Sequence, residues 1–543
     1  MAADGGGSGP AGRELEASRR AVARWRRVVV AFALLPPLAL AAAERYLFGD
    51  LDGFPLDDSW IHLVFARHLA QGDGLAFNLG ERVAGSTAPL WTALLALLAA
   101  LPGPAVLWAK AAGAAAQAAT AGATFAAARR LGLSAPRAGL AGLLVALSEG
   151  LVLSALSGME VGFFTFLSLA GLARHLDERA DPARPPVGFL LFGLAALARP
   201  EGLLLPVLAA ADLALVARAG GLALDRARAR RALTGLALAA VVIVPVALVY
   251  LQMSGSPLPT TLAAKSSGPP RLVPELRFLE AIFALLFAAQ PLPALLAAGG
   301  AVVAVKRLGG PRDRGVLLPA WTFGLPVAAA MLSSGQELLI GNFGRYFFPL
   351  LPMVVLLGLL ALDELSFARW RALRLGGLRL PLGALVLVAL VAVPAVRSVR
   401  AGALYLRARA NVEDGDGAAA TWLAANVPGD ARLAVCDIGY AGWRLPNPIV
   451  DLGGIVSPGR RAFLARMARE RALPWPAALR LWLDEERPEY VVVYPAWFPL
   501  LERESARFPA LHRIRIADNV ALAGDELVVY ATPWTRTRTP GER

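Results

Sequence analysis

Two adjacent carboxylates, Asp57 and Asp58, are the side chains of this sequence best suited to act as a general base. They lie just after the first long apolar run, and adjacent carboxylates at a membrane surface repel one another. That repulsion raises the pKa of one of the two unless a cation or a metal ion neutralises the pair. The alternative is a cap, because Asp is a preferred N-cap and a helix is expected over residues 59–70. Capping accounts for only one of the two, so the pair favours catalysis.

The loop around this pair, residues 49–87, is the part of the chain richest in polar candidates. His62 lies four residues after Asp58 on the expected helix, so the imidazole can lie beside the carboxylate. A solvated loop histidine is the alternative. The same loop also contains Arg67, Asn78, Glu81 and Arg82.

Ionisable residues at the ends of later apolar runs form a second group. An ionisable residue in such a place is costly, so a functional role is a fair expectation. Arg199 and Glu201 have the alternative of pairing with each other or marking a helix break at Pro200. For Glu160 and Arg345 the alternative is an anchor at the membrane surface.

Lysine is scarce in this arginine-rich chain and occurs at positions 110, 265 and 306. Lys265 is the one expected in an outer loop. There it either binds phosphate as a point charge or is an exposed solubilising charge.

The composition indicates the kind of protein that must position these residues. Of 543 residues, 57% are hydrophobic and only 17% charged, which is too apolar for a soluble globular protein. The net charge of +13 comes from arginines between apolar runs, as in topology determinants, so no nucleic-acid partner is expected. With Cys436 as the single cysteine, an intrachain disulfide is excluded and a cysteine-based metal site is implausible.

Eleven apolar runs are candidates to cross the membrane. The run 88–101 is only about 21 Å long as a helix, so a juxtamembrane or re-entrant helix is expected there. The first run passes into Glu44 and Arg45 without a clear cleavage site, which favours a span over a signal peptide. The expected spans lie near 28–48, 105–128, 137–156, 159–176, 186–198, 202–217, 232–251, 291–305, 315–333, 346–365 and 381–398.

The arginines orient these spans. With 88–101 not spanning, the arginine-rich loops all fall on one side, which the positive-inside rule makes cytoplasmic. We therefore expect a multi-pass protein of the bacterial inner membrane with loop 49–87 outside. Residues 1–27 are expected to be a disordered, basic cytoplasmic N-terminus.

After about residue 400 the composition becomes that of a soluble α/β segment. The mostly apolar strands suggest a sheet buried on both faces. The sequence thus predicts a polytopic α-helical module over 28–399 and an extracytoplasmic α/β domain over 400–543. The expected strands lie at 432–437, 448–452, 490–494, 513–517 and 527–532, and the expected helices at 418–425 and 460–471.

Taken in this order, the segments resemble the GT-C superfamily of membrane glycosyltransferases. More narrowly, they are similar to the mycobacterial terminal arabinofuranosyltransferases and related bacterial proteins. Trp60, Ser86 and Ala88 depart from the family pattern, so the resemblance leaves the sugar open. The outer-loop residues that carry the resemblance are Asp57, Asp58, Ile61, Arg67, Leu69, Gly72, Gly74, Asn78, Gly80, Glu81, Arg82, Val83, Gly85, Thr87, Leu90 and Trp91. Weaker matches are Gly158-Met159-Glu160, Arg199-Pro200-Glu201-Gly202, Lys265 and Gly344-Arg345-Tyr346.

The resemblance implies inverting sugar transfer on the outer face, from a polyprenyl-phosphate donor to an envelope glycan, lipid or protein. It implies Asp57 as the base, with Asp58 as its partner or as a ligand of a divalent metal, which some members of the superfamily use. Activity without a metal is equally compatible. Lys265 and Arg345 are expected to hold phosphate, and Glu160, Arg199 and Glu201 to shape the cavity. The further expected substrate-binding residues are His62, Arg67, Asn78, Glu81, Arg82 and Tyr346.

A multi-span transporter or flippase is the main alternative from another class. Transporter sites usually include charged residues deep in a span, whereas the ionisable groups here gather at one face. A non-catalytic envelope scaffold fits the C-terminal part but leaves the loop around Asp57 unexplained.

Overall fold

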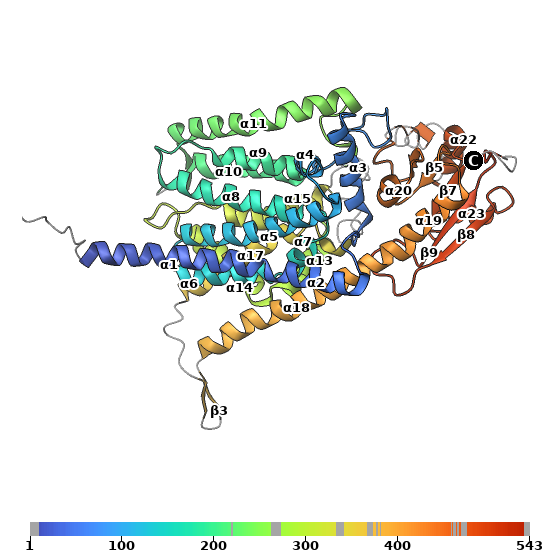
Figure 1. Ribbon diagram of the computed structural model, residues 1–543. Coiled ribbons are helices and arrows are strands. Elements are labelled where there is room, and N and C mark those ends of the chain that lie inside the picture. The colour runs from blue at the N-terminus through green and yellow to red at the C-terminus, as the bar shows by residue number, and fades with distance from the viewer. Residues whose placement is uncertain are drawn as a thin grey trace, which may run out of the picture.

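The apolar runs expected to cross the membrane are helical over most of their length in the computed structural model. The structure describes residues 10–218, 221–261, 273–332, 342–365, 373–375, 378–380, 382–457, 459, 463, 466–467 and 475–536. Most helices lie side by side in a bundle, and an α/β domain lies at one end of it (Figure 1).

The bundle helices are α1 (Pro10–Ala33), α2 (Leu35–Phe48), α5 (Ala105–Arg130), α6 (Ala135–Ala146), α7 (Glu149–Ala155), α8 (Val161–Ala180), α9 (Gly188–Ala198), α10 (Leu204–Ala214), α11 (Arg226–Ser254), α13 (Leu276–Ala289), α14 (Pro291–Lys306), α15 (Leu317–Leu332), α17 (Leu351–Glu364) and α18 (Leu382–Val412). Short 3₁₀ turns are η1 (Pro200–Leu203), η2 (Asn342–Gly344) and η3 (Phe348–Leu350). Two antiparallel hairpins pair β1 (Leu215–Arg218) with β2 (Gly221–Leu224) and β3 (Leu373–Leu375) with β4 (Leu378–Leu380).

Three of the described helices are long and apolar enough to cross a membrane, and two bent helix pairs raise the number to five. The expected number of about eleven spans therefore stays a prediction. Helix α1 begins at Pro10, within the segment 1–27 that the sequence predicts to be disordered. Its sequence is rich in Ala and Arg, which favour helix, and Glu16 pairs with Arg20 one turn later.

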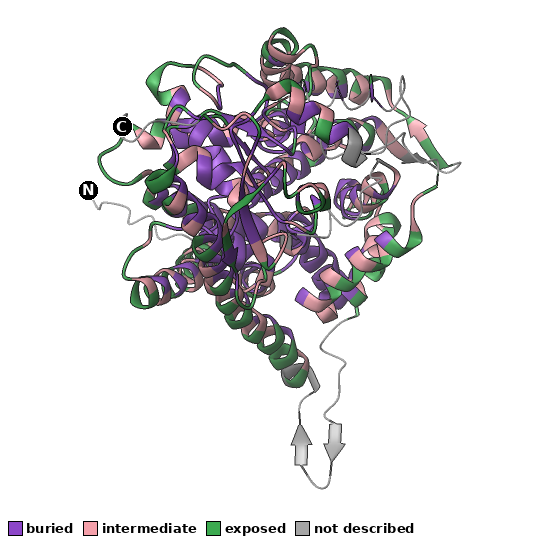
Figure 2. Cartoon of the chain, turned by 90° about the vertical axis from the view of Figure 1, so that its right-hand side faces the viewer, coloured by how far each residue is buried: buried purple, intermediate pink, exposed green. Residues whose placement is uncertain are grey.

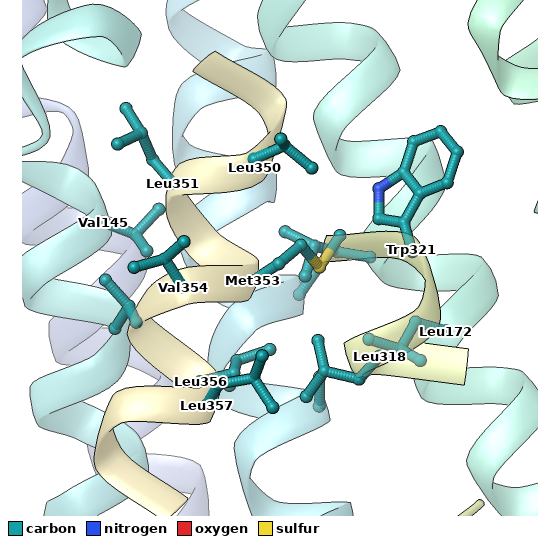
Figure 3. Close-up of a cluster of buried hydrophobic side chains, with 14 of the residues drawn as sticks. Val145, Leu172, Leu318, Trp321, Leu350, Leu351, Met353, Val354, Leu356 and Leu357 are labelled. Carbon is teal, nitrogen blue, oxygen red and sulfur yellow. The ribbon is translucent and has the colours of Figure 1, made fainter. Parts of the chain in front are cut away.

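Helix α17 lies at the centre of the bundle. Every side chain over 351–362 is buried, as expected for a helix that is apolar on all sides. Figure 3 shows its leucines and Met353 packed between Val145, Leu318 and Trp321 of neighbouring helices. The short turn Phe348–Leu350, which precedes α17, is thus attached to a fully buried helix.

The C-terminal α/β domain is built on one mixed sheet in the order β6-β5-β7-β9-β8. The two parallel pairs are β5 with β6 and β5 with β7, and the antiparallel pairs are β7 with β9 and β8 with β9. Its strands are β5 (Leu433–Val435), β6 (Ile449–Asp451), β7 (Tyr490–Val493), β8 (Ala510–Arg515) and β9 (Glu526–Ala531), and its helices are α19 (Ala418–Asn426), α20 (Ile438–Arg444), α22 (Trp475–Glu486) and α23 (Pro499–Arg503). All five expected strands are thus present. The helix expected over 460–471 lies mostly outside the described residues.

Loop 49–87, called the outer loop after its expected position, shares a hydrophobic core with this domain. Loop helices α3 (Asp57–Gln71) and α4 (Pro89–Ala99) follow α2, and α3 lies across the end of the bundle, between the bundle and the domain (Figure 1). Trp60 and Phe65 of α3 join one buried cluster with Val435 and Val492 of the sheet. Figure 2 looks onto this end and shows the buried residues at its centre. The domain is therefore packed on the loop that carries the paired carboxylates.

Helix α18 connects the bundle to the domain and crosses the expected boundary at residue 400 without a break. A π-helical segment, Glu413–Gly417, continues it into α19. A buried ion-pair network fixes α18 to the bundle, because Glu44 contacts both Arg409 of α18 and Lys110 of α5. The domain is thus attached by a continuous helical connection as well as by its shared core.

Candidate active site

A cavity of about 540 Å³ lies where the outer loop, the bundle and the C-terminal domain meet. One part of its wall is lined by charged side chains and another part by apolar side chains. Its lining residues are Asp58, Ile61, His62, Gly85, Thr87, Met159, Glu160, Arg199, Pro200, Glu201, Leu203, Leu204, Val207, Leu258, Thr261, Leu325, Ala328, Ala329, Arg345, Tyr346, Phe347 and Ile455.

Asp58 and Arg345 form an ion pair in this cavity. Asp58 lies in the first turn of α3, and Arg345 directly follows the turn η2. Gly344 has a positive φ of 72°, and a Cβ there would lie 2.1 Å from Leu285 Cδ1. A side chain at this position would be strained, so glycine is favoured before Arg345.

The Arg345 guanidinium has bonding capacity left over. The residue is only 3% exposed, and its Nε and Nη1 groups have no hydrogen-bond partner among the residues that the structure describes. Its Nη2 donates to Asp58 Oδ2. A buried cation with unpaired N–H groups is costly unless an anion accepts from them. The geometry therefore favours an anion beside Arg345.

Glu160 joins three parts of the charged wall. It accepts from Arg199 Nη1 at 2.6 Å, and its second oxygen lies 3.2 Å from His62 Nε2. Arg199 also donates to Glu201 through Nε at 2.5 Å. The pairing of Arg199 with Glu201 and the helix break at Pro200, the alternative to a functional role, are both present, since α9 ends just before Arg199 and Pro200 starts η1. The imidazole of His62 pairs with Glu160, although the sequence suggests Asp58.

Tyr346 lies between the two arginines of the cavity. Its ring centroid is 4.9 Å from the Arg199 guanidinium carbon and 5.4 Å from that of Arg345. Such cation–π contacts are favourable and stronger where water is excluded. The ring thus helps to hold both guanidinium groups against the cavity.

Asp57 does not line the cavity. Its carboxylate accepts from the backbone N–H groups of Gly439 at 2.8 Å and Tyr440 at 2.6 Å, in the first turn of α20. Burial, together with the nearby charge of Asp437, raises the pKa of Asp57, and the two N–H donors oppose this shift. Asp57 is a cap, but of a helix 382 residues further along the chain rather than of α3.

Four of the other loop candidates lie away from the cavity. Arg67 donates to the carbonyls of Gly442 and Trp443, both at 3.0 Å. Asn78 donates to the Ile449 carbonyl and accepts from its N–H, both at 2.9 Å. The amide of Asn78 also donates to Glu81 Oε2 at 3.1 Å, and Arg82 is exposed. The interactions of Arg67 and Asn78 join the outer loop to the C-terminal domain, so the structure gives no support to substrate binding by these residues.

Lys265 lies outside the described residues, and its expected phosphate contact stays a prediction. A metal ligand set is not found in the described part of the chain: no group of three or more His, Cys, Asp or Glu side chains is arranged to hold an ion. Asp58 Oδ2 accepts a hydrogen bond from Arg345, so the guanidinium already supplies a positive charge beside this carboxylate. The possible metal role of Asp58 therefore stays a prediction.

The apolar wall was not singled out from the sequence. It is formed by η1, α10 and α15, and Val207 and Leu203 are 58% and 37% exposed. These two side chains thus keep a large solvent-accessible area. Single apolar residues carry no signal that separates such a wall from ordinary span packing. Ile455, from the loop after β6, is a further lining residue without a sequence signal.

Comparison with known proteins shows similarity over the whole chain in structure and over the C-terminal part in sequence. Residues 403–536 match a family described only as a domain of unknown function, DUF8728. No curated protein matches the chain in sequence.

Solved structures with a similar fold cover nearly all of the chain. ArnT from Cupriavidus metallidurans, bound to undecaprenyl phosphate, has a TM-score of 0.58 at 16% identity, covering 95% of this chain and 99% of that one. The Archaeoglobus fulgidus oligosaccharyltransferase in the apo form has a TM-score of 0.58 at 13% identity, covering 93% and 76%. AglB from the same organism, in complex with an inhibitory peptide and a dolichol-phosphate, has a TM-score of 0.57 at 13% identity, covering 86% and 69%.

These neighbours are GT-C glycosyltransferases. The expectation from the sequence resemblance is confirmed at the level of the fold, and the chain has the fold of the GT-C membrane glycosyltransferases.

Proposed function

We propose that this protein is a membrane glycosyltransferase that moves a sugar from a polyprenyl-phosphate donor to an acceptor hydroxyl, with Asp58 as the general base. The observation that carries the proposal is the cavity itself. Asp58 lies beside a buried Arg345 with unpaired N–H groups, and the apolar wall includes the exposed side chains of Leu203 and Val207. A lipid phosphate matches both parts. The similar folds of ArnT and AglB, solved with undecaprenyl phosphate and a dolichol-phosphate, support this ligand class.

The geometry favours Asp58 over Asp57 as the base. A base must reach the proton that it removes within hydrogen-bond distance. Asp58 lines the cavity, whereas both oxygens of Asp57 accept backbone N–H groups of α20. We therefore assign to Asp58 the general-base role that the family resemblance implies for Asp57.

The proposed reaction is a single displacement at the anomeric carbon of the donor. The acceptor oxygen forms a bond to this carbon while the bond between the carbon and the phosphate oxygen breaks. Asp58 takes the acceptor proton, and the polyprenyl phosphate leaves with the electron pair of the broken bond. Attack opposite to the leaving group inverts the configuration.

Arg345 would bind the phosphate throughout this step. Its Nη2 holds Asp58, and its Nε and Nη1 groups are available to the phosphate oxygens. Fixed N–H donors in a site that excludes water stabilise the charge that develops on a leaving group. Arg345 thus joins the base and the leaving group in one arrangement.

His62, Glu160, Arg199 and Glu201 form the supporting side of the cavity. These residues form ion pairs with one another, so most of their charge is neutralised within the wall. We propose that they shape the cavity and orient the sugar hydroxyl groups, while Arg345 holds the phosphate.

We propose that the cavity lies on the outer face of a bacterial inner membrane, together with loop 49–87 and the C-terminal domain. The arginine pattern supports this orientation. Single-cysteine labelling after replacement of Cys436 tests it. A cysteine at Asp73 should react with an impermeant reagent and one at Arg226 should be protected, and the reverse result would invert the orientation.

A deletion strain tests the function. Its envelope should lack one glycan substituent, and its pool of polyprenyl-phosphate sugar should rise. The wild-type gene should restore both, and an Asp58→Asn gene that inserts normally should restore neither. Unchanged glycans with altered movement of lipid or solute would favour a transporter instead.

A further inference from the structure

The C-terminal domain contributes a residue to the cavity wall. The other described lining residues come from segments up to residue 347, but Ile455 belongs to the loop that follows β6. This loop, Asp451 to Val456, is called the roof loop below. It lies within the part of the chain that matches a family of unknown function.

The roof loop is held in one shape by a buried carboxylate. Asp451 is fully buried and accepts the backbone N–H groups of Gly453 at 2.6 Å, Val456 at 2.8 Å and Ile455. Its own N–H donates to Ser457 Oγ at 3.0 Å. With three N–H groups bonded to one side chain, the loop resists rearrangement.

The roof loop is also bonded to the bundle side of the cavity. Thr260 Oγ1 lies 2.8 Å from the Ile455 carbonyl oxygen and 3.1 Å from that of Ala84. At Gly85 the two chains approach closely, because a Cβ there would lie 3.3 Å from the Ile455 oxygen and 3.1 Å from Val456 Cγ1. The position of Ile455 relative to the cavity is thus fixed from two sides.

We propose that the C-terminal domain is part of the active site, and that Ile455 is a specificity-determining residue that bounds the space for the transferred sugar. This inference rests on the proposed function. Ile455 lines the same cavity as Asp58 and Arg345, and its carbonyl lies close to Gly85. The buried Asp451 and the Thr260 contact position this wall, so they are positioning residues.

Cysteine protection tests the location without requiring turnover. In a Cys436→Ala background, an Ile455→Cys variant is labelled with a maleimide in detergent, with and without undecaprenyl phosphate. The lipid phosphate should slow labelling at position 455 several-fold. A Leu511→Cys variant is the matched control, because Leu511 is exposed on β8 of the same domain. Its labelling rate should not change.

The outcomes separate the inference from the proposed function. Binding of undecaprenyl phosphate to the wild-type protein, measured by native mass spectrometry, tests the function. Absence of binding contradicts the function and this inference with it. Binding without protection at position 455 contradicts the inference alone.

Substrate selection tests the role. Ile455→Ala enlarges the cavity and Ile455→Phe reduces it, and a methylene in a shaped pocket changes discrimination by about 10-fold or more. The ratio of kcat/KM for a pentosyl and a hexosyl phosphoundecaprenol should therefore shift about 10-fold in opposite directions in the two variants. Thr260→Val, which removes the bond to the Ile455 carbonyl, should lower this discrimination. If Ile455→Ala and Ile455→Phe lower kcat/KM for both donors alike and leave the ratio unchanged, Ile455 has only a structural role and the inference is contradicted.

Discussion

At the scale of the residue, the adjacent carboxylates Asp57 and Asp58 have different partners because neighbouring helix positions point in different directions. One faces the cavity and Arg345, and the other faces the N-terminus of α20. The sequence indicates that this pair is important and that Arg345 belongs to the same site. It does not divide the roles, because α20 lies 382 residues away along the chain.

Replacing Asp57 should affect stability more than chemistry. Asp57→Ala leaves two N–H groups of α20 without their acceptor, which costs about 1–3 kcal/mol. Hydrogen exchange at Gly439 and Tyr440 should become faster, and the thermal midpoint should fall. Glu485→Ala, at an exposed carboxylate of α22, is the control and should change neither. If exchange at both positions stays slow in Asp57→Ala, the capping role is wrong.

Replacing Arg345 should weaken lipid phosphate binding. Arg345→Lys keeps the charge but loses the planar set of donors, and Arg345→Ala loses both. Affinity for undecaprenyl phosphate, titrated by native mass spectrometry, should fall about 10-fold and about 100-fold respectively. Arg480→Ala, at an exposed ion pair with Glu504, should leave it unchanged. Equal affinities in all four proteins would remove the phosphate site from Arg345.

At the scale of the element, α3 is the piece that joins bundle, cavity and domain. Its Trp60 and Phe65 enter the core shared with the sheet, and its Arg67 bonds to α20. The strands of the domain are predictable from short apolar runs, and the bundle helices from long ones. The contacts of Arg67 and Asn78 cannot be predicted in this way. A polar loop residue looks the same in the sequence whether it binds a substrate or another part of the chain.

Arg67→Ala should loosen α3 from α20 without altering the cavity. The variant loses two hydrogen bonds to carbonyls and a guanidinium contact 4.8 Å from the Trp443 ring centroid. We expect a loss of about 2 kcal/mol in unfolding free energy, seen in denaturant or thermal unfolding, and an unchanged affinity for undecaprenyl phosphate. Lost affinity at unchanged stability would instead return Arg67 to the substrate site.

At the scale of the whole molecule, the helical bundle and the C-terminal domain share one hydrophobic core and both line the cavity. The interface between them contains several acids, among them Asp57, Asp416 and Asp437. Burial raises the pKa of Asp437 to about 6, and the Tyr494 hydroxyl, 2.7 Å from its Oδ2, opposes this shift. This shared core could not be predicted from the sequence, because contacts between segments far apart in the chain leave no local signal.

This acid should make stability depend on pH. Between its ordinary value of about 3.8 and its folded value of about 6, Asp437 stays protonated in the folded protein and ionises in the unfolded chain. Each rise in pH through that window therefore favours unfolding. The thermal midpoint of Asp437→Asn should exceed that of the wild type at pH 7, with a smaller difference at pH 4. A lower midpoint for Asp437→Asn at pH 7 would contradict the raised pKa of Asp437.

The central claim is that Asp58, not Asp57, removes the acceptor proton. The direct measurement is the rate at which Asp58→Asn, Asp57→Asn and the wild type release polyprenyl phosphate from a glycosyl phosphoundecaprenol in membranes with the native acceptor. Loss of a general base lowers a rate by about 100- to 10,000-fold, so Asp58→Asn should fall in that range while it still binds undecaprenyl phosphate, and Asp57→Asn should retain most of the activity. Near-normal release by Asp58→Asn, or an equal loss in Asp57→Asn at unchanged stability, would contradict the account.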